Sequence, residues 1–339
     1  MLNFTQNMMF YSAGKAPTIL SPGFNDVSPP GLPIMNTVST SNTGKVFAGG
    51  NNGVMMFSSD SVNWDAPVIN TAFTGNPSGQ ILASTFTSTN NTLVLGGWSL
   101  SGVVSRSVDD GATWIANTTD MAARSVTDLT TGHTGVVWGT FTGSFAYARK
   151  GGFFASADGT ANNIIYENGV GDGHTDIAAG LARSYTFADG SWSGAKSYLH
   201  FNNGSPWGYT RQSNGWKITS MAASWPLGKI VVTTTDSQLI SFNENDVTPG
   251  LPSQSVSYVH GPNPVYTPWR SVCWSAARAE FFAVGDLGMM ASSSDGINWT
   301  YINGVPNTYN FRDVAYNSIA DCYNIVGEAG GAGSYSYYK

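Results

Sequence analysis

The stretch Ser-Val-Asp-Asp-Gly-Ala-Thr-Trp at residues 107–114 gathers a hydroxyl group, two adjacent carboxylates, a glycine and a tryptophan. Related stretches lie at residues 58–64 and 293–299. Carboxylates beside a hydroxyl could serve in acid–base catalysis or in metal binding. An aspartate at the start of a tight turn can instead accept hydrogen bonds from backbone N–H groups, while the glycine supplies the left-handed backbone conformation. We favour this structural role, so the chemistry of the protein has to be sought elsewhere.

A second group of ligand-type side chains consists of Asp172, His174 and Asp176, which are spaced two residues apart. In an extended segment all three would point to the same side and could hold a metal ion. The alternative is a polar connecting loop, which we favour, so we expect no metal and no cofactor. Glycine-rich stretches such as residues 327–333 lack the strand-to-helix context of a phosphate-binding loop.

The composition predicts an all-β protein. Of the 339 residues, 40 are glycine, 41% are apolar and only 11% are charged. Turn-forming residues separate short apolar runs, and no long stretch keeps the apolar period of a helix. The formal charge is −6 and the 15 basic residues are scattered, which argues against a nucleic-acid partner.

The chain shows no sign of a membrane segment or a secretory signal. No apolar run approaches the roughly 18 residues of a membrane span, so we expect no membrane insertion. Residues 1–15 lack a basic segment followed by an apolar core. Cys273 and Cys322 have neither metal-binding nor disulfide spacing, and we interpret them as reduced, apolar side chains.

An internal repeat organises the chain. Residues 269–299 align with residues 311–339, with Arg270 opposite Arg312, at an offset of 42 residues. Each copy reads as three strands, then a Ser-x-Asp turn and a fourth strand. More degenerate copies lie at residues 44–64, 91–114, 135–159, 195–216 and 228–246. This pattern predicts a seven-bladed β-propeller with four-stranded blades, forming a single domain over residues 1–339.

The ends of the chain indicate how the ring closes. The last copy ends at its third strand, and a strand-like stretch at residues 3–13 precedes the first copy. We therefore predict that residues 1–13 form the outer strand of the last blade, so that N- and C-terminal strands close the ring. Residues 14–34, rich in proline and glycine, would connect this strand to the first blade.

The spacing Ser107-x-Asp109-x-Gly111-x-x-Trp114 resembles the Asp-box, or BNR repeat, of sialidase-like and photosystem II assembly factor-like propellers. The same style of repeat occurs in propellers of bacteriophage tails. In that family the turn joins strands three and four on the face away from the binding site. The resemblance therefore implies a structural role for Asp60, Asp109, Asp295, Trp64, Trp114 and Trp299.

Loops between strands two and three would then surround the opposite mouth of the central channel. They combine amides and hydroxyls with aromatic residues, which suits a sugar; the alternative is that they are ordinary turns. The predicted ligand- or partner-binding residues are Asn51, Asn52, Trp98, Phe141, Asn202, Asn203 and Asp286.

The resemblance to sialidases does not extend to their catalytic residues. That activity implies three arginines, a tyrosine–glutamate pair and an aspartate acid/base, and the Phe/Tyr-Arg-Ile-Pro signature of the first arginine is absent. Arg270 and Arg312 occupy equivalent repeat positions, which indicates a role in blade structure. We assign no catalytic residues and do not expect an enzyme.

Three functions remain open from the sequence. The leading hypothesis is a non-enzymatic structural or receptor-binding component of a bacteriophage tail or virion, made in the host cytoplasm. Its partners would be other virion or tail proteins, or a host surface glycan or receptor. The alternatives are a sialidase-like glycoside hydrolase and an intracellular propeller that acts as an assembly factor. Fold alone does not decide among them.

Overall fold

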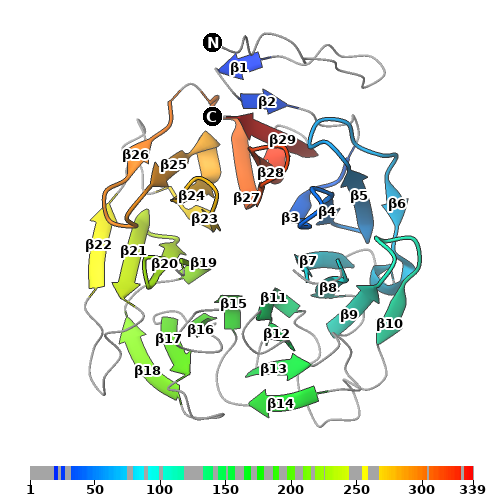
Figure 1. The fold of residues 1–339 in the computed structure, drawn as a ribbon, viewed down its shortest axis with the longest axis horizontal. Coiled ribbons are helices and arrows are strands. Elements are labelled where there is room, and N and C mark those ends of the chain that lie inside the picture. The colour runs from blue at the N-terminus through cyan, green and yellow to red at the C-terminus, as the bar shows by residue number, and fades with distance from the viewer. Residues whose placement is uncertain are drawn as a thin grey trace.

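A computed structural model gives the fold of the chain (Figure 1). It describes residues 19–21, 24–26, 32–74, 79–87, 91–98, 102–117, 133–139, 144–149, 152–156, 164–168, 174–178, 186–190, 197–202, 209–214, 218–224, 226–243, 254–258, 267–303, 305–329 and 332–338. These residues form strands and two short 3-10 turns, η1 (Thr71–Phe73) and η4 (Asp286–Gly288), so the all-β prediction is confirmed. No helix in this part of the chain has the length and apolarity needed to cross a membrane.

The described strands form seven antiparallel sheets. The first contains β3 (Met35–Thr40), β4 (Val46–Gly50), β5 (Val54–Ser58) and β6 (Val68–Ile69). The second contains β7 (Gln80–Phe86), β8 (Leu93–Trp98), β9 (Gly102–Ser107) and β10 (Ile115–Asn117). The third contains β11 (His133–Gly139), β12 (Ser144–Arg149), β13 (Gly152–Ser156) and β14 (Ile164–Asn168).

The remaining sheets continue in chain order. The fourth contains β15 (His174–Ala178), β16 (Thr186–Gly190), β17 (Ser197–Asn202) and β18 (Tyr209–Asn214). The fifth contains β19 (Ile218–Ser224), β20 (Lys229–Thr234), β21 (Gln238–Asn243) and β22 (Gln254–Tyr258). The sixth contains β23 (Trp269–Ser275), β24 (Glu280–Gly285), β25 (Met290–Ser293) and β26 (Thr300–Tyr301). The last contains β27 (Tyr309–Asn317), β28 (Cys322–Ala329), β29 (Ala332–Tyr338), β2 (Phe24–Asp26) and β1 (Ile19–Ser21).

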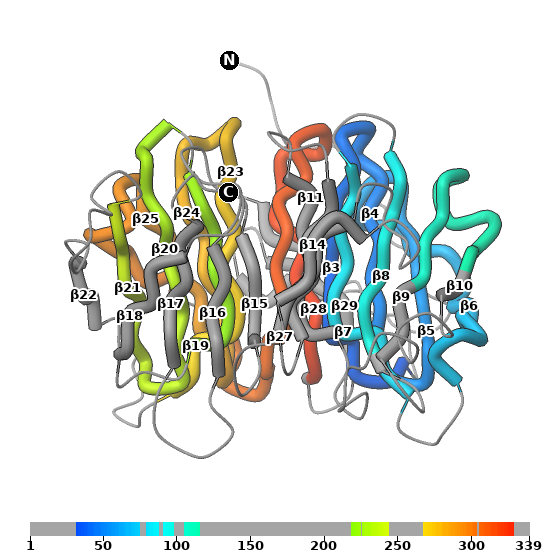
Figure 2. The backbone as a smooth tube through the Cα atoms, turned by 90° about the horizontal axis from the view of Figure 1, so that it is seen from below, coloured from blue at the N-terminus to red at the C-terminus, as the bar shows by residue number. Residues whose placement is uncertain are grey.

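The sheets stand around a common centre, as Figure 1 shows. The first strand of each repeat lies innermost and contacts the innermost strands of the two neighbouring sheets, including β27 with β3. The protein is therefore a β-propeller, as the repeat predicts. Strands run between two faces of the ring (Figure 2), and neighbouring strands are antiparallel. Connections from strand one to two and from three to four thus lie at one face, and those from two to three at the other.

The sheet that closes the ring differs in detail from the prediction. It has five strands, in the order β1-β2-β29-β28-β27, rather than four. Its N-terminal strand β2 pairs antiparallel with the C-terminal strand β29, with Phe24 opposite Tyr337. Strands from the two ends of the chain do pair, but β2 belongs to the segment interpreted as a connection, residues 14–34. The predicted closing strand, residues 1–13, lies outside the described residues.

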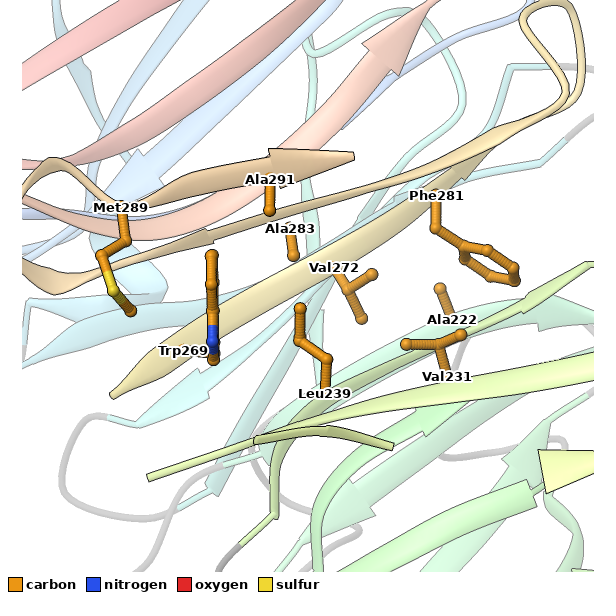
Figure 3. Close-up of a cluster of buried hydrophobic side chains, with 9 residues drawn as sticks. All are labelled: Ala222, Val231, Leu239, Trp269, Val272, Phe281, Ala283, Met289 and Ala291. Carbon is orange, nitrogen blue, oxygen red and sulfur yellow. The ribbon is translucent and has the colours of Figure 1, made fainter. Parts of the chain in front are cut away.

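The hydrophobic core is divided among the interfaces between sheets. Successive side chains of a strand point to opposite faces, so an apolar strand can serve two interfaces. On β24, Phe281 packs in the cluster shared with the fifth sheet (Figure 3), while Phe282 packs in the cluster shared with the last sheet. This explains the continuous apolar runs of the sequence. Cys322, which is buried, and Cys273, which is half-buried, are not joined in a disulfide.

A carboxylate also links three neighbouring sheets near the centre. Asp313 on β27 accepts a hydrogen bond from the hydroxyl of Ser271 on β23 at 2.7 Å. It also accepts bonds from the hydroxyl of Thr37 at 3.2 Å and the backbone N–H of Val38 at 2.9 Å, both on β3. Burial raises the pKa of Asp313, and these hydrogen bonds oppose the rise. The junction between the last and first sheets is therefore held by polar contacts.

Candidate functional site

The innermost strand of every sheet carries an extra residue near its start. At this point the register with the second strand shifts, so one residue bulges from the ladder. The bulged residues are Asn36, Leu82, Thr134, Thr175, Thr219, Arg270 and Arg312. A β-bulge bends a strand and redirects a side chain. The bulges form a ring at one end of the sheets, which we call the mouth face; it also carries the connections that follow β4, β8, β24 and β28.

In several sheets a glycine of the second strand pairs with the residue before the bulge. A β carbon on Gly327 would lie 2.2 Å from the carbonyl oxygen of Asn310. A β carbon on Gly285 would lie 2.5 Å from the carbonyl oxygen of Pro268. Only a hydrogen atom fits at these distances, so glycine allows the two backbone segments to approach.

Side chains at the mouth face form pairs that recur around the ring. In the sixth sheet, Nε and Nη2 of Arg270 donate to the two carboxylate oxygens of Asp286 at 2.9 and 2.6 Å. These hydrogen bonds raise the pKa of Arg270 above its ordinary value. In the last sheet, Arg312 donates from Nη2 alone to Oε1 of Glu328 at 2.8 Å. Equivalent positions thus carry one two-bond and one single-bond ion pair.

In the first sheet, two asparagine side chains occupy the positions that an arginine and its acidic partner occupy in the sixth and last sheets. Nδ2 of Asn36 donates to Oδ1 of Asn51 at 2.9 Å and to the carbonyl oxygen of Ile81, in the next sheet, at 3.1 Å. The hydroxyl of Thr219 likewise donates to the carbonyl oxygen of Trp269, in the sheet that follows it, at 2.6 Å. Bulged side chains therefore connect neighbouring sheets as well as positions within one sheet.

Four of the seven predicted binding residues belong to the mouth face. Asn51 and Asn52 follow β4, Trp98 ends β8, and Asp286 follows β24. Trp98 has the register position of Asn51 and Asp286, one residue beyond the glycine that pairs with the residue before the bulge. The structure describes the backbone of Trp98 but not its side chain. Ligand or partner binding by these residues stays a prediction.

Of the other three predicted residues, the structure describes only Asn202. Asn202 ends β17, the third strand of its sheet, and so lies at the opposite end. Asn203 and Phe141 lie outside the described residues, and Phe141 falls in the connection between β11 and β12, the first and second strands of their sheet. Residues 139–144 and 200–205 are therefore not connections between strands two and three. The repeat copies that contain these residues lack either the aspartate or the tryptophan of the Ser-x-Asp turn. The sequence therefore does not show which strand of the sheet each stretch follows.

The metal-binding alternative involves Asp172, His174 and Asp176. His174 and Asp176 lie on β15, and the register of β15 with β16 shifts between them. Asp172 lies outside the described residues. Within the part of the chain that the structure describes, no group of three or more histidine, cysteine, aspartate or glutamate side chains could hold a metal ion.

The opposite end of the sheets, which we call the turn face, carries the Ser-x-Asp turns at residues 58–64, 107–114 and 293–299. Oδ1 of Asp295 accepts hydrogen bonds from the backbone N–H groups of Ile297 and Asn298 at 2.8 and 2.7 Å. Oδ2 accepts a bond from the side chain of Asn298 at 2.8 Å. Burial opposes ionisation of Asp295, but these bonds outweigh it and hold the pKa well below its ordinary value.

The other two aspartates are bonded in the same way. Asp109 accepts bonds from the hydroxyl and the backbone N–H of Thr113 and from Ser107, which lower its pKa to about 2. Asp60 accepts bonds from the backbone and the side chain of Asn63. Burial opposes its ionisation, yet the hydrogen bonds lower its pKa too. Each carboxylate is thus occupied by donors of its own turn.

Each Ser-x-Asp turn also packs against the preceding sheet. A β carbon on Gly111 would lie 2.2 Å from the ring of Phe57. In the first turn, Ser61 takes the left-handed position at φ 66° and accepts a 2.8 Å bond from Nδ2 of Asn317 across the ring closure. Three tryptophans pack against the clusters between sheets: Trp64, Trp114 and Trp299.

Sequence reasoning missed several residues of the mouth face. Arg270 and Arg312 were visible as equivalent repeat positions, but their acidic partners and their place at the mouth were not. The 42-residue offset that relates the arginines also maps Asp286 onto Glu328, so the repeat itself held this signal. Asn36 and the other bulged residues had no signal, because a bulge follows from backbone pairing.

Comparison with known proteins gives a fold without a family. No family model and no curated protein matches the chain. A solved structure of YCF48 bound to D1 peptide is similar over 96% of this chain and 98% of that chain, with a TM-score of 0.68 and 13% identity. YCF48 from Cyanidioschyzon merolae is similar over 93% and 98%, with a TM-score of 0.65 and 13% identity. At this identity the likeness establishes the fold alone.

Proposed function

We propose that this β-propeller is a non-enzymatic assembly factor that binds a segment of a partner protein at its mouth face. The observation that carries the proposal is the likeness, over 96% of this chain, to a propeller solved with a peptide of a second protein, D1. A propeller of this shape can therefore hold a polypeptide. We identify the partner of this chain by its chemistry alone.

The chemistry of the mouth face suits a polypeptide ligand. A peptide backbone offers hydrogen-bond donors and acceptors in alternation. The mouth presents the amides of Asn36 and Asn51 together with the ion pairs of Arg270 and Arg312, whose side chains are 31% and 36% exposed. Because these groups stand on the bulges of packed inner strands, little conformational freedom is lost when they bind a ligand.

A buried tyrosine–glutamate hydrogen bond is consistent with the non-enzymatic part of the proposal. Tyr323 donates to Oε1 of Glu280 at 2.9 Å, and both side chains are buried. Burial also raises the pKa of Tyr323. A catalytic tyrosine has to reach its substrate and lose its proton, and the position of this pair opposes both steps.

The comparisons favour the assembly-factor hypothesis over the virion hypothesis, since a propeller of this shape binds a peptide and neither similar structure is described as a virion protein. The two hypotheses require different ligands at the same face. An assembly factor binds a protein segment, whereas the virion hypothesis also allows a surface glycan.

A pair of tryptophan variants, one from each face, tests the proposal. We expect Trp98→Ala to weaken partner capture about tenfold, by loss of one interface aromatic, with little change in melting temperature. Trp114→Ala should lower the melting temperature, because Trp114 packs against the cluster between the first and second sheets. Capture by its folded fraction should be unchanged. The measurements are quantitative affinity capture from extract of the natural source and thermal melting.

Two outcomes would contradict the proposal. One is normal capture by Trp98→Ala together with a loss for Trp114→Ala beyond its unfolded fraction. The other is retention on a glycan array, or turnover of a fluorogenic glycoside, with no protein captured.

A further inference from the structure

We propose that the mouth face reads an extended partner segment at three consecutive sheets. In the last sheet, Arg312 binds an acidic side chain of the segment. In the first sheet, the amides of Asn36 and Asn51 bind its backbone. In the second sheet, Leu82 and Trp98 mark the position for an apolar side chain. This inference rests on the proposed function and adds the chemical class of the segment.

The two arginines at equivalent positions differ in spare hydrogen-bonding capacity. Arg270 uses both Nε and Nη2 on Asp286. Arg312 uses only Nη2 on Glu328, and its Nε is buried without a hydrogen-bond partner in the described part of the chain, so a ligand would be bound by the remaining N–H groups of Nη1 and Nη2. A guanidinium has five N–H donors, and the side chain of Arg312 is 36% exposed. Arg312 can therefore donate to a second carboxylate beside Glu328, and its single hydrogen bond to Glu328 holds its guanidinium less firmly than the two bonds to Asp286 hold that of Arg270.

The neighbouring amide pair is suited to the backbone of the segment. The bonds within the pair use Nδ2 of Asn36 and Oδ1 of Asn51. An asparagine side chain has an acceptor, Oδ1, and a donor, Nδ2. Oδ1 of Asn36 can therefore accept from a peptide N–H, and Nδ2 of Asn51 can donate to a peptide C=O. The bond from Asn36 to the carbonyl of Ile81 fixes the orientation of the amide.

The second sheet replaces these polar pairs with apolar residues. Leu82 is its bulged residue and is half-buried. Trp98 follows the glycine that pairs with Ile81, and this is the register position of Asn51 in the first sheet and of Glu328 in the last. Because leucine and tryptophan replace the polar pairs at this position, we expect it to favour an apolar residue of the segment.

The three positions are held in a fixed order around the ring. β27 contacts β3, and β3 contacts β7. The bonds that Asp313 accepts from Thr37 and Val38 fix the last sheet against the first. The segment is therefore expected to carry an acidic residue, a spacer and an apolar residue along one extended stretch, with the spacer over the amide pair.

The test uses fluorescein-labelled Gly/Ser peptides that carry one glutamate and one phenylalanine at different separations, with binding measured by fluorescence anisotropy. The wild-type protein should bind one separation best, and replacing the peptide glutamate with glutamine should weaken it about tenfold, as for loss of one charge-assisted bond. Arg312→Gln should weaken the parent peptide equally and remove its preference for glutamate. Glu328→Gln should strengthen binding, because it removes the competing carboxylate.

The matched control is Arg278→Gln, which removes an arginine of the turn face that pairs with Asp321 at 2.9 Å. It should leave peptide affinity unchanged, and Leu82→Asn should remove the preference for phenylalanine. Melting temperatures verify that each variant is folded. Equal losses for Arg312→Gln and Arg278→Gln, or weaker binding by Glu328→Gln, would overturn the inference while leaving partner capture intact. Binding of no peptide above the Gly/Ser background would also overturn it, and loss of partner capture itself would reject the proposed function instead.

Discussion

The two faces of the propeller use the same repeat in opposite ways. On the turn face the side chains recur: aspartates at three equivalent turns accept bonds from their own turns, and three tryptophans pack against the interfaces between sheets. On the mouth face the backbone recurs. Every inner strand bulges at the same place, while the bulged residues range from asparagine and leucine to threonine and arginine.

This difference separates frame from recognition. A side chain that recurs in several sheets has a structural role that those sheets share, such as hydrogen bonding within a turn or packing against the neighbouring sheet. A backbone feature that recurs with different side chains presents a varied surface from a rigid ring, and such a surface can be specific for one ligand. The conspicuous Ser-x-Asp turns therefore belong to the frame in our account, and the less conspicuous mouth face carries the binding chemistry.

The largest effect is expected from Gly327→Ala at the mouth face. The new β carbon would meet the carbonyl oxygen of Asn310 at 2.2 Å, and backbone atoms cannot move aside as a side-chain end can. We expect a loss of roughly 1–3 kcal/mol in the free energy of unfolding, in the range for overpacked sites. Chemical denaturation measures it.

The matched control at the turn face is Gly296→Ser. Gly296 is left-handed at φ 71°, and Ser61 already occupies the equivalent position at φ 66°. The nearest neighbour of the new β carbon would be a methyl group of Val231 at 3.0 Å. We therefore expect a smaller loss in the free energy of unfolding, about 1 kcal/mol. A larger loss for Gly296→Ser than for Gly327→Ala would contradict the view that the backbone is most constrained at the mouth.

A smaller, pH-dependent effect is expected from Asp109→Asn on the turn face. The hydrogen bonds from Thr113 and Ser107 lower the pKa of Asp109 to about 2, below its ordinary value of 3.8. The charge therefore favours the folded state above about pH 4, and this contribution is lost as the pH falls toward 2. The melting-temperature difference between wild type and variant should shrink over that interval. A melting-temperature difference that stays constant from pH 6 to pH 2 would show that the charge of Asp109 does not stabilise the folded state.

The sequence predicted the propeller but not the whole of its mouth. The Ser-x-Asp turns mark the junction of strands three and four. In the first, second and sixth sheets they therefore showed which segment forms which strand, and this placed Asn51 and Asp286 at the correct end. In the third and fourth sheets the marker is incomplete, and Asn202 is at the other end. The ring of bulges could not be read from residue types, because asparagine, leucine, threonine and arginine all occupy it.

Photo-crosslinking from each face tests the central claim most directly. A photoreactive amino acid would replace Asn51, which is half-buried at the mouth face, or Asn298, which is exposed at the turn face, in the protein as expressed in its natural source. Our account predicts a covalent adduct with one partner protein from position 51, lost when Arg312→Gln is added, and no adduct from position 298. An adduct formed through position 298 and absent at position 51 would contradict it, because the partner would then bind the face that we assign to the frame.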